Sequence, residues 1–136
     1  MVKATDNIII LSTQKIRAST IKGLLKKSLA SDVNIAVTDP DAPIPSNESN
    51  SKYLIILDLM SVDLPAKQII SRIKKTHQNA GIIALHMYRS SMLVEPLFEF
   101  GVNGYVYYEP TREELTSAII SVSNGERYVP EYLLGT

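Results

Sequence analysis

Hydrophobic residues along this chain follow two alternating patterns. Short uninterrupted runs, typical of strands buried on both faces of a parallel sheet, alternate with segments in which hydrophobic residues recur every three or four positions, as on one face of a helix. The runs predict five strands, at Asn7–Leu11, Val33–Thr38, Tyr53–Leu57, Gly81–Leu85 and Tyr105–Tyr108. This alternation predicts an α/β fold, a parallel sheet with right-handed crossovers and helices on both faces.

Helical periodicity fills the intervals between most of these strands. It predicts helices at Gln14–Leu29, from about Ala66 to His77, within Ser90–Phe100, and from Thr111 to Asn124–Gly125. Pro96 falls inside the third helix, and proline is tolerated in a first turn but disrupts later ones. That helix is therefore predicted to be either short, starting near Val94, or kinked. The last helix opens on Thr111 and Glu114, which have the form of a capping box.

The segment between the second and third strands, Asp39–Lys52, follows neither pattern. It contains three prolines and a cluster of Ser and Asn residues, which favour a loop. A loop of this length is uncommon inside a compact domain. We predict an irregular connection here, with disorder near Ser46–Ser51.

Composition is that of an ordinary globular domain. With 136 residues the chain suffices for one domain, and fourteen basic residues balance fourteen acidic ones, so no overall field attracts nucleic acid or an anionic membrane. The chain has no cysteine, and His77 and His86 do not have the spacing of metal ligands. No hydrophobic run is long enough for a signal peptide or a membrane span. We expect a cytoplasmic location.

One predicted helix carries a basic row without an acidic residue between its members: Lys15, Arg17, Lys22, Lys26 and Lys27. Such a row could contact a partner or a phosphate backbone. Because no aromatic residues are interleaved with the charges, we interpret it as a solvated helix face.

The candidate for chemistry is Asp58, which follows the most hydrophobic run of the chain. In open α/β sheets, ligands bind at the carboxyl ends of the strands. A carboxylate placed where a buried strand emerges is therefore in the position of a functional group.

Three stretches carry a more specific pattern: Ile55–Met60, Gly101–Tyr105, and Arg112–Leu115 leading to Asn124–Tyr128. Together they resemble the receiver domain of bacterial two-component response regulators, most closely the receivers that precede a LuxR-type helix-turn-helix. The resemblance implies a flavodoxin-like (βα)5 three-layer sandwich with strand order 2-1-3-4-5, in which Asp39–Lys52 replaces the family's second helix. Residues 1–126 would form the receiver-like domain, and 127–136 a tail or the start of an interdomain linker.

The resemblance also implies a site. In the family, an acidic pair and a phospho-acceptor Asp hold Mg²⁺, while a Thr or Ser and a Lys bind the phosphoryl oxygens. The acceptor position matches Asp58, and the aromatic switch position matches Tyr105. The remaining pocket positions are occupied by other residue types, namely Ser12 and Thr13 at the acidic pair, His86 at the hydroxyl and Tyr108 at the lysine.

These replacements remove the hard anionic ligands that Mg²⁺ needs, so we expect no metal, no other cofactor and no useful phosphorylation. Asp63 is a weaker candidate for a substitute ligand. His86 could form a protonated pair with Asp58, but we favour a neutral histidine that fills space.

Three functions remain open. The favoured one is a non-enzymatic signalling or dimerisation module, in a transcriptional regulator whose longer chain has a DNA-binding domain. Its protein partner or second copy would bind helix faces, either the first and last helices or the surface around the last strand. The alternatives are a working phospho-receiver that accepts a phosphoryl group on Asp58 from a histidine kinase, and a small-molecule-binding domain. The sequence lacks both a glycine-rich phosphate loop and a nucleophile elbow.

Overall fold

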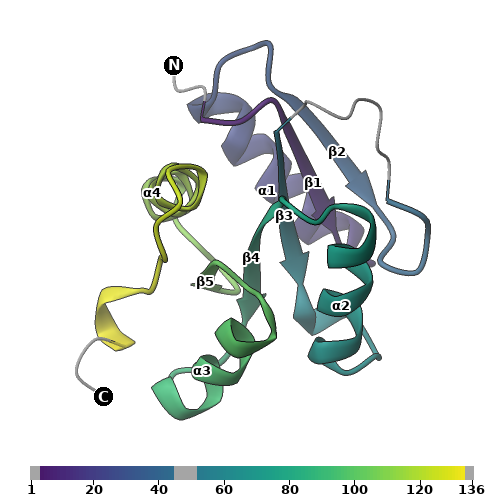
Figure 1. The fold of residues 1–136 in the computed structure, drawn as a ribbon. Coiled ribbons are helices and arrows are strands. Elements are labelled where there is room, and N and C mark those ends of the chain that lie inside the picture. Colours follow the sequence, from purple (N-terminus) through teal and green to yellow (C-terminus); the bar gives the residue numbers. More distant parts are fainter. Residues whose placement is uncertain (1–3, 45–51, 134–136) are drawn as a thin grey trace.

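The computed structural model describes residues 4–44 and 52–133, which form a five-stranded parallel sheet with helices on both faces (Figure 1). The strands are β1 (Asn7–Leu11), β2 (Asn34–Thr38), β3 (Tyr53–Asp58), β4 (Gly81–His86) and β5 (Gly104–Tyr107). They lie in the order β2-β1-β3-β4-β5, which confirms the predicted α/β, flavodoxin-like topology. The helices are α1 (Lys15–Ser28), α2 (Ala66–Thr76), α3 (Ser91–Phe100) and α4 (Arg112–Ser123), with 3₁₀ turns η1 (Leu59–Ser61) and η2 (Glu131–Leu133).

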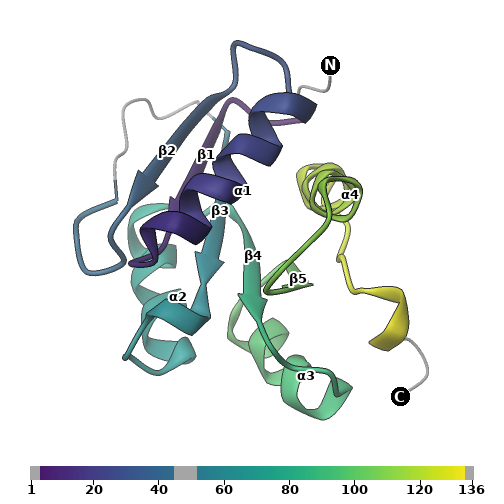
Figure 2. The same ribbon diagram turned by 180° about the vertical axis from the view of Figure 1, so that it is seen from behind.

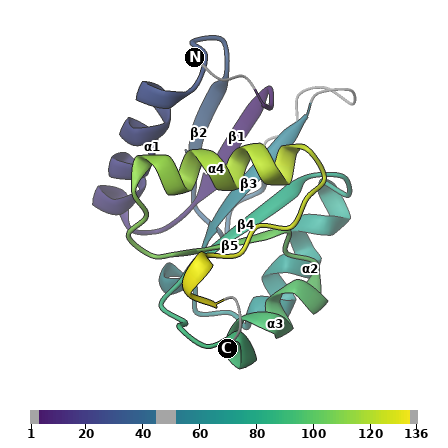
Figure 3. The ribbon, with the colours of Figure 1, turned by 90° about the vertical axis from the view of Figure 1, so that its left-hand side faces the viewer.

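The alternation of side chains along each strand divides the core into two halves. Ile8, Ile10, Leu54 and Ile56 pack with the buried residues of α1 and α4, whereas Ile9, Leu11, Ile55 and Leu57 pack with those of α2 and α3. Figures 2 and 3 show the same division, with α1 and α4 on one side of the sheet and α2 and α3 on the other. None of the helices in the described ranges has the length and apolar character needed to cross a bilayer.

The connection between β2 and β3 contains no helix in its described part, residues 39–44 and 52. Asp39 Oδ1 accepts a hydrogen bond from the Asp41 amide at 2.8 Å, which forms a local turn in place of a helical start. The predicted disorder near Ser46–Ser51 lies outside the described residues.

Helix α3 differs from one of the two sequence predictions. It begins at Ser91, so the alternative of a short helix starting near Val94 is wrong. The hydroxyl of Ser90 accepts a hydrogen bond from the Met92 amide at 3.2 Å and caps the first turn, which favours an early start despite Pro96 inside the helix. Strand β5 ends at Tyr107, one residue before the predicted end, so Tyr108 lies outside the ladder.

At the start of α4, the Thr111 hydroxyl accepts a hydrogen bond from the Glu114 amide at 3.1 Å. This is one half of the predicted capping box. The Glu114 carboxyl turns inward instead of returning to Thr111: its Oε1 is buried without a hydrogen-bond partner among the described residues, and burial raises the pKa of this carboxyl.

The segment after α4 packs on the domain. Tyr128 pairs in parallel with Gly104, and it exchanges backbone hydrogen bonds with Asn103 (3.1 Å) and Tyr105 (3.0 Å). Leu133, in η2, is 4% exposed and joins the core on the α2 and α3 side of the sheet. Residues 127–133, predicted as a tail or linker, thus lie along the edge of β5 (Figure 3).

Candidate functional site

Asp58 is the last residue of β3 and is fully buried at the carboxyl edge of the sheet. Strand alternation places its side chain on the same face as Leu54 and Ile56, which is the face that α1 covers. Its Oδ1 accepts a hydrogen bond from the Met60 amide at 3.2 Å and thereby caps the turn η1. A buried carboxylate in this position requires donors or a counter-charge.

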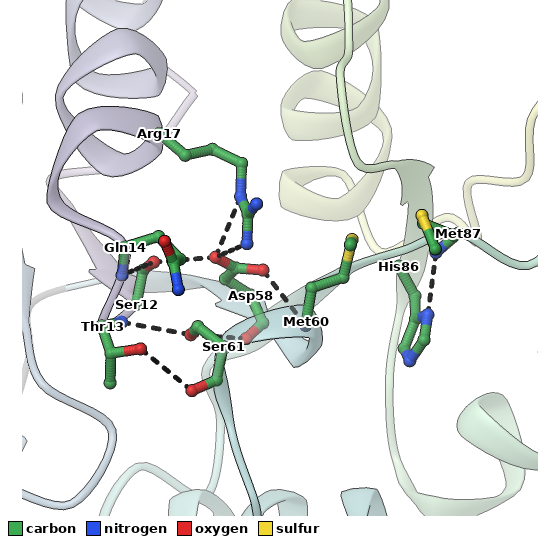
Figure 4. Close-up of polar contacts among 9 residues, drawn as sticks. All are labelled: Ser12, Thr13, Gln14, Arg17, Asp58, Met60, Ser61, His86 and Met87. Carbon is green, nitrogen blue, oxygen red and sulfur yellow. Dashed lines mark hydrogen bonds and ion pairs between the residues drawn. The ribbon is translucent and has the colours of Figure 1, made fainter.

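The counter-charge comes from Arg17 on α1. Its Nε and Nη2 lie 3.1 and 2.5 Å from Oδ2 of Asp58, and its side chain is 23% exposed (Figure 4). The prediction that the basic row is simply a solvated helix face is therefore wrong for Arg17. This side chain turns from the row into the site because Asp58 has no other cationic partner within the described residues.

Ser12 and Thr13, at the positions of the family's acidic pair, are both committed to hydrogen bonds. The Ser12 hydroxyl donates to Oδ2 of Asp58 at 2.7 Å and accepts from the Gln14 amide at 3.0 Å. Thr13 does not contact Asp58 but binds Ser61 twice, through its amide (3.1 Å to Oγ) and its hydroxyl (3.0 Å to the carbonyl oxygen). Ser61 Oγ in turn donates to the Asp58 carbonyl at 3.0 Å. The loop after β1 and the turn after β3 are thus joined around the carboxylate (Figure 4).

His86 lies at the end of β4 but makes no hydrogen bond or ion pair with Asp58 within the described part of the chain. Its Nδ1 accepts from the Met87 amide at 2.8 Å, and its ring stacks on Tyr88 with centroids 4.0 Å apart. Burial lowers the pKa of His86, while the negative charge of Asp58 opposes this shift as the smaller cause. A ring whose Nδ1 accepts a hydrogen bond is unprotonated there, which favours the neutral, space-filling histidine over a protonated pair.

Tyr105, at the aromatic switch position, is fully buried. Its hydroxyl lies 2.9 Å from the carbonyl oxygen of His86 and 2.7 Å from that of Tyr88, to which it donates. Burial is the main cause that raises the pKa of this hydroxyl. Tyr105 therefore fastens the loop after β4 from inside the core.

Tyr108 stands where the family has a lysine, and it is half-buried. It packs edge-on against Tyr107, with ring centroids 5.0 Å apart, and Tyr107 in turn carries the guanidinium of Arg89 4.5 Å from its ring centroid. No cation from this end of the sheet reaches Asp58 within the described residues. Asp63 is exposed, and no contact joins it to Asp58 in that same part of the chain.

The donor set of Asp58 explains what the site can do. Oδ2 receives the Ser12 hydroxyl and two N–H groups of Arg17, and Oδ1 receives the Met60 amide. Residues 4–44 and 52–133 contain no group of three or more His, Cys, Asp or Glu side chains that could hold a metal ion. The geometry is that of a charge-neutral pair in which Oδ2 receives three donors and Oδ1 receives one.

Sequence reasoning missed two residues of this network, Arg17 and Ser61. A signal for Arg17 was present, because it lies in the first turn of the helix that follows the Ser12–Thr13 loop, at the same edge of the sheet as Asp58. A buried carboxylate needs a cation, and Arg17 supplies it. Ser61 left no comparable signal.

Comparisons with known proteins find solved structures with a similar fold. No protein-family model matches the chain, and no curated protein matches it. A LuxR family DNA-binding response regulator from Staphylococcus aureus matches 88% of this chain and 99% of its own at 27% identity, with a TM-score of 0.68. The isolated REC domain of RcsB from Salmonella enterica serovar Typhimurium matches with 93% coverage of both chains, 20% identity and a TM-score of 0.71. A LuxR family DNA-binding response regulator from Silicibacter pomeroyi matches 92% of this chain and 97% of its own at 16% identity, with a TM-score of 0.69.

These similar structures span nearly the whole chain, whose sheet order β2-β1-β3-β4-β5 is the one expected of a flavodoxin-like receiver. The aspartate at the end of β3 is where the receiver pattern of the sequence places the phospho-acceptor. The chain therefore has the fold of a response-regulator receiver domain and is similar to those of LuxR-family regulators.

Proposed function

We propose that this domain is a non-enzymatic signalling module that works without Mg²⁺-dependent phosphorylation of Asp58. The observation that carries the proposal is the ion pair between Arg17 and Asp58. The guanidinium neutralises the carboxylate from within the protein, which is the electrostatic role that Mg²⁺ has in the family.

The residues around Asp58 do not fit Mg²⁺. This ion prefers hard anionic oxygens in near-octahedral geometry, and Asp58 is the one carboxylate in the network described above. A divalent cation at Oδ2 would have to displace the two N–H groups of Arg17 and the hydroxyl of Ser12. We therefore assign no step to a metal.

Nucleophilic attack on a phosphoryl donor is disfavoured for the same reason. The attacking oxygen must be free, and the charge of the incoming group must be neutralised by cations placed for it. Here Oδ2 is occupied by three donors and Oδ1 accepts the Met60 amide, while the lysine position, which would neutralise the incoming group, holds Tyr108. The competing function is a phospho-receiver with a modified site. It is supported by the presence of Asp58 at the acceptor position and of the basic Arg17 beside it.

We further propose that the module acts through a protein partner or a second copy, in a cytoplasmic regulator with a DNA-binding domain elsewhere in a longer chain. The similar proteins from Staphylococcus aureus and Silicibacter pomeroyi are named as DNA-binding response regulators, which supports this setting. The candidate surfaces are α1 with α4, and α3 with β5 and α4. The second surface is partly covered by residues 127–133, which favours the first. We assign neither direct nucleic-acid contact nor membrane contact to this domain. A small-molecule ligand at the crevice is a weaker alternative, because Ser12 and Arg17 already occupy Oδ2 of Asp58.

A phosphoryl mimic tests the central proposal. The chain is titrated with beryllofluoride in the presence of Mg²⁺ and followed by amide NMR, with Asp58→Asn as the matched variant. We expect no saturable shifts in either protein. Mg²⁺-dependent shifts around Asp58, His86 and Tyr105 that disappear in Asp58→Asn would show a working phospho-receiver and overturn the proposal.

A further inference from the structure

A second polar site lies on the outer face of α2. A groove of about 500 Å³ runs along the helix from Leu64 and Pro65 to Lys75. The core-facing residues of this helix are Ile69, Ile70 and Ile73, so the groove occupies the opposite face. It is separate from the Asp58 site, because α2 and α1 cover opposite faces of the sheet (Figures 1 and 2).

The groove is strongly cationic. Lys67, Arg72 and Lys75 line it together with the hydroxyl of Ser71 and the amide of Gln68, and its lining includes no carboxylate. The fourth cation of the helix, Lys74, is turned elsewhere and donates to the Ala80 carbonyl at 3.3 Å. Three positive charges thus face one concave surface without a negative charge on it.

Arg72 is the most informative of these residues. It is half-buried, and its Nη2 is closed to solvent without a hydrogen-bond partner in the described part of the chain. Burying a charged donor without an acceptor costs free energy, and natural proteins rarely leave such a group unmatched. An atom closed to solvent cannot itself meet a ligand in the groove, so an anion there would bind the part of the Arg72 guanidinium that lines it. The planar guanidinium suits the paired oxygens of a phosphate.

The spacing of the polar residues indicates the size of the ligand. Ser71 and Lys75 are four residues apart, as are Gln68 and Arg72 and likewise Lys67 and Ser71, so neighbouring pairs project about 5–6 Å from one another. The row from Lys67 to Lys75 extends about 12 Å along the helix. One phosphate group cannot contact both ends, whereas two linked phosphates can bridge Arg72, Ser71 and Lys75 and approach Lys67.

We propose that this groove binds a small molecule that carries a pyrophosphate group, held by Lys67, Arg72 and Lys75 with Ser71 as a neutral donor. Leu64 and Pro65 form an apolar end next to the cations. That end would contact the remainder of a nucleoside diphosphate and would be unused by inorganic pyrophosphate. The proposal is independent of the state of Asp58.

A basic helix face that is merely solvated is the competing explanation, and α1 supplies the control. Lys26 is exposed on α1 and does not line the groove on α2. Added anions screen the charges of both helices alike, so screening shifts the amide resonances of α1 and α2 together. Binding at a specific site shifts those of α2 alone.

The test is an amide NMR titration of the whole chain with pyrophosphate and, separately, with ADP, at ionic strength held constant with sodium chloride. We expect saturable shifts confined to residues 64–75. We expect an affinity about tenfold weaker in Arg72→Gln, equivalent to about 1.4 kcal/mol, and no change in Lys26→Gln. ADP that binds more tightly and shifts Leu64 would identify a nucleotide, and equal binding would identify the inorganic ion. Lys75→Gln, altered at an exposed position, repeats the test should Arg72→Gln fail to fold. Shifts of equal size on α1 and α2, or an affinity unchanged in both groove variants, would overturn the proposal.

Discussion

The guanidinium of Arg17 lies against the carboxylate of Asp58, with Nε 3.1 Å from Oδ2. The two residues are 41 positions apart, one on α1 and the other at the end of the central strand β3. Their pairing ties a helix to the buried end of the sheet at the place where a receiver would bind its metal ion. The cation that compensates the site is therefore part of the chain.

Removing this cation is expected to weaken the fold. Arg17→Ala leaves the buried Asp58 with the Ser12 hydroxyl and the Met60 amide but without a counter-charge. We expect a loss of about 2 kcal/mol in the free energy of unfolding, in the range of charged hydrogen bonds. Urea denaturation measures it, with Lys26→Ala on the exposed side of α1 as the control, expected within about 0.5 kcal/mol of wild type. Equal effects of the two variants would contradict the pairing.

Placing the family's acidic pair at positions 12 and 13 should create a binding site for Mg²⁺. In the triple variant Ser12→Asp, Thr13→Asp, Arg17→Ala, three carboxylates meet at the crevice and the competing guanidinium is gone, so we expect saturable binding of Mg²⁺. A titration followed by amide shifts at residues 12–17 and 58–61 measures it. The double variant that keeps Arg17 should bind more weakly, because the cation repels the ion. Wild-type protein that binds Mg²⁺ as tightly as the triple variant would refute this account.

His86 is expected to titrate below its ordinary value, since burial lowers its pKa from 6.5. The unfolded chain then binds the proton more tightly than the folded one, so the contribution of His86 to stability is complete above about pH 6.5 and declines as the pH falls below it. Imidazole NMR resonances give the pKa directly, and His86→Gln should flatten this part of the stability profile. Asp58→Asn should lower the pKa further, because the charge of Asp58 favours the imidazolium. A pKa above 6.5 would instead support the protonated pair.

Replacing two of the glycines with alanine, one at a time, should change the free energy of unfolding in opposite directions. A Cβ on Gly81 would lie 2.5 Å from Cγ1 of the buried Val122, so Gly81→Ala is expected to cost about 1–3 kcal/mol by overpacking. The double variant with Val122→Ala should lose less than the sum of the two single changes. A Cβ on Gly23, inside α1, meets nothing within 4 Å, so Gly23→Ala should stabilise by about 0.5–1 kcal/mol through helix propensity. Denaturation curves of Gly81→Ala, Val122→Ala, their double variant and Gly23→Ala measure these changes in the free energy of unfolding.

Residues 127–133 should contribute to the stability of the domain. Leu133 is buried in the core on the α2 and α3 side, so Leu133→Ala is expected to cost about 2–3 kcal/mol. Tyr132 is 44% exposed, and Tyr132→Ala should cost clearly less. If Leu133→Ala left the free energy of unfolding unchanged, the segment would be only loosely attached, and a domain boundary at residue 126 would describe it well.

The elements were predictable because each depends on a local pattern. The run from Tyr53 to Leu57 is hydrophobic at every position, as a strand buried on both faces must be, and Thr111 caps its helix as its sequence indicates. Pro96 misled the prediction of α3 in part, because the Ser90 cap at the first turn was not weighed against it.

The site was less predictable because its contacts join distant parts of the chain. Asp58 could be found from its place after a buried strand, and Ser12 from the family pattern. The role of Arg17 could not be read from helical periodicity, which separates a buried face from a solvated one but does not show that α1 passes over the end of β3. The docking of Tyr128 likewise depends on where the edge of β5 lies in space.

The pairing of Tyr128 with Gly104 makes the two borders of the sheet unequal. At β5 the amide of Tyr105 is already engaged by the chain itself, and side chains from residues 127–133 cover the border. At β2 the described residues add no further strand, and Val37 is 43% exposed. An unpaired border of this kind accepts an extended peptide by strand addition. Within the described residues, growth of this sheet by a partner or by aggregation is therefore expected at β2 and not at β5.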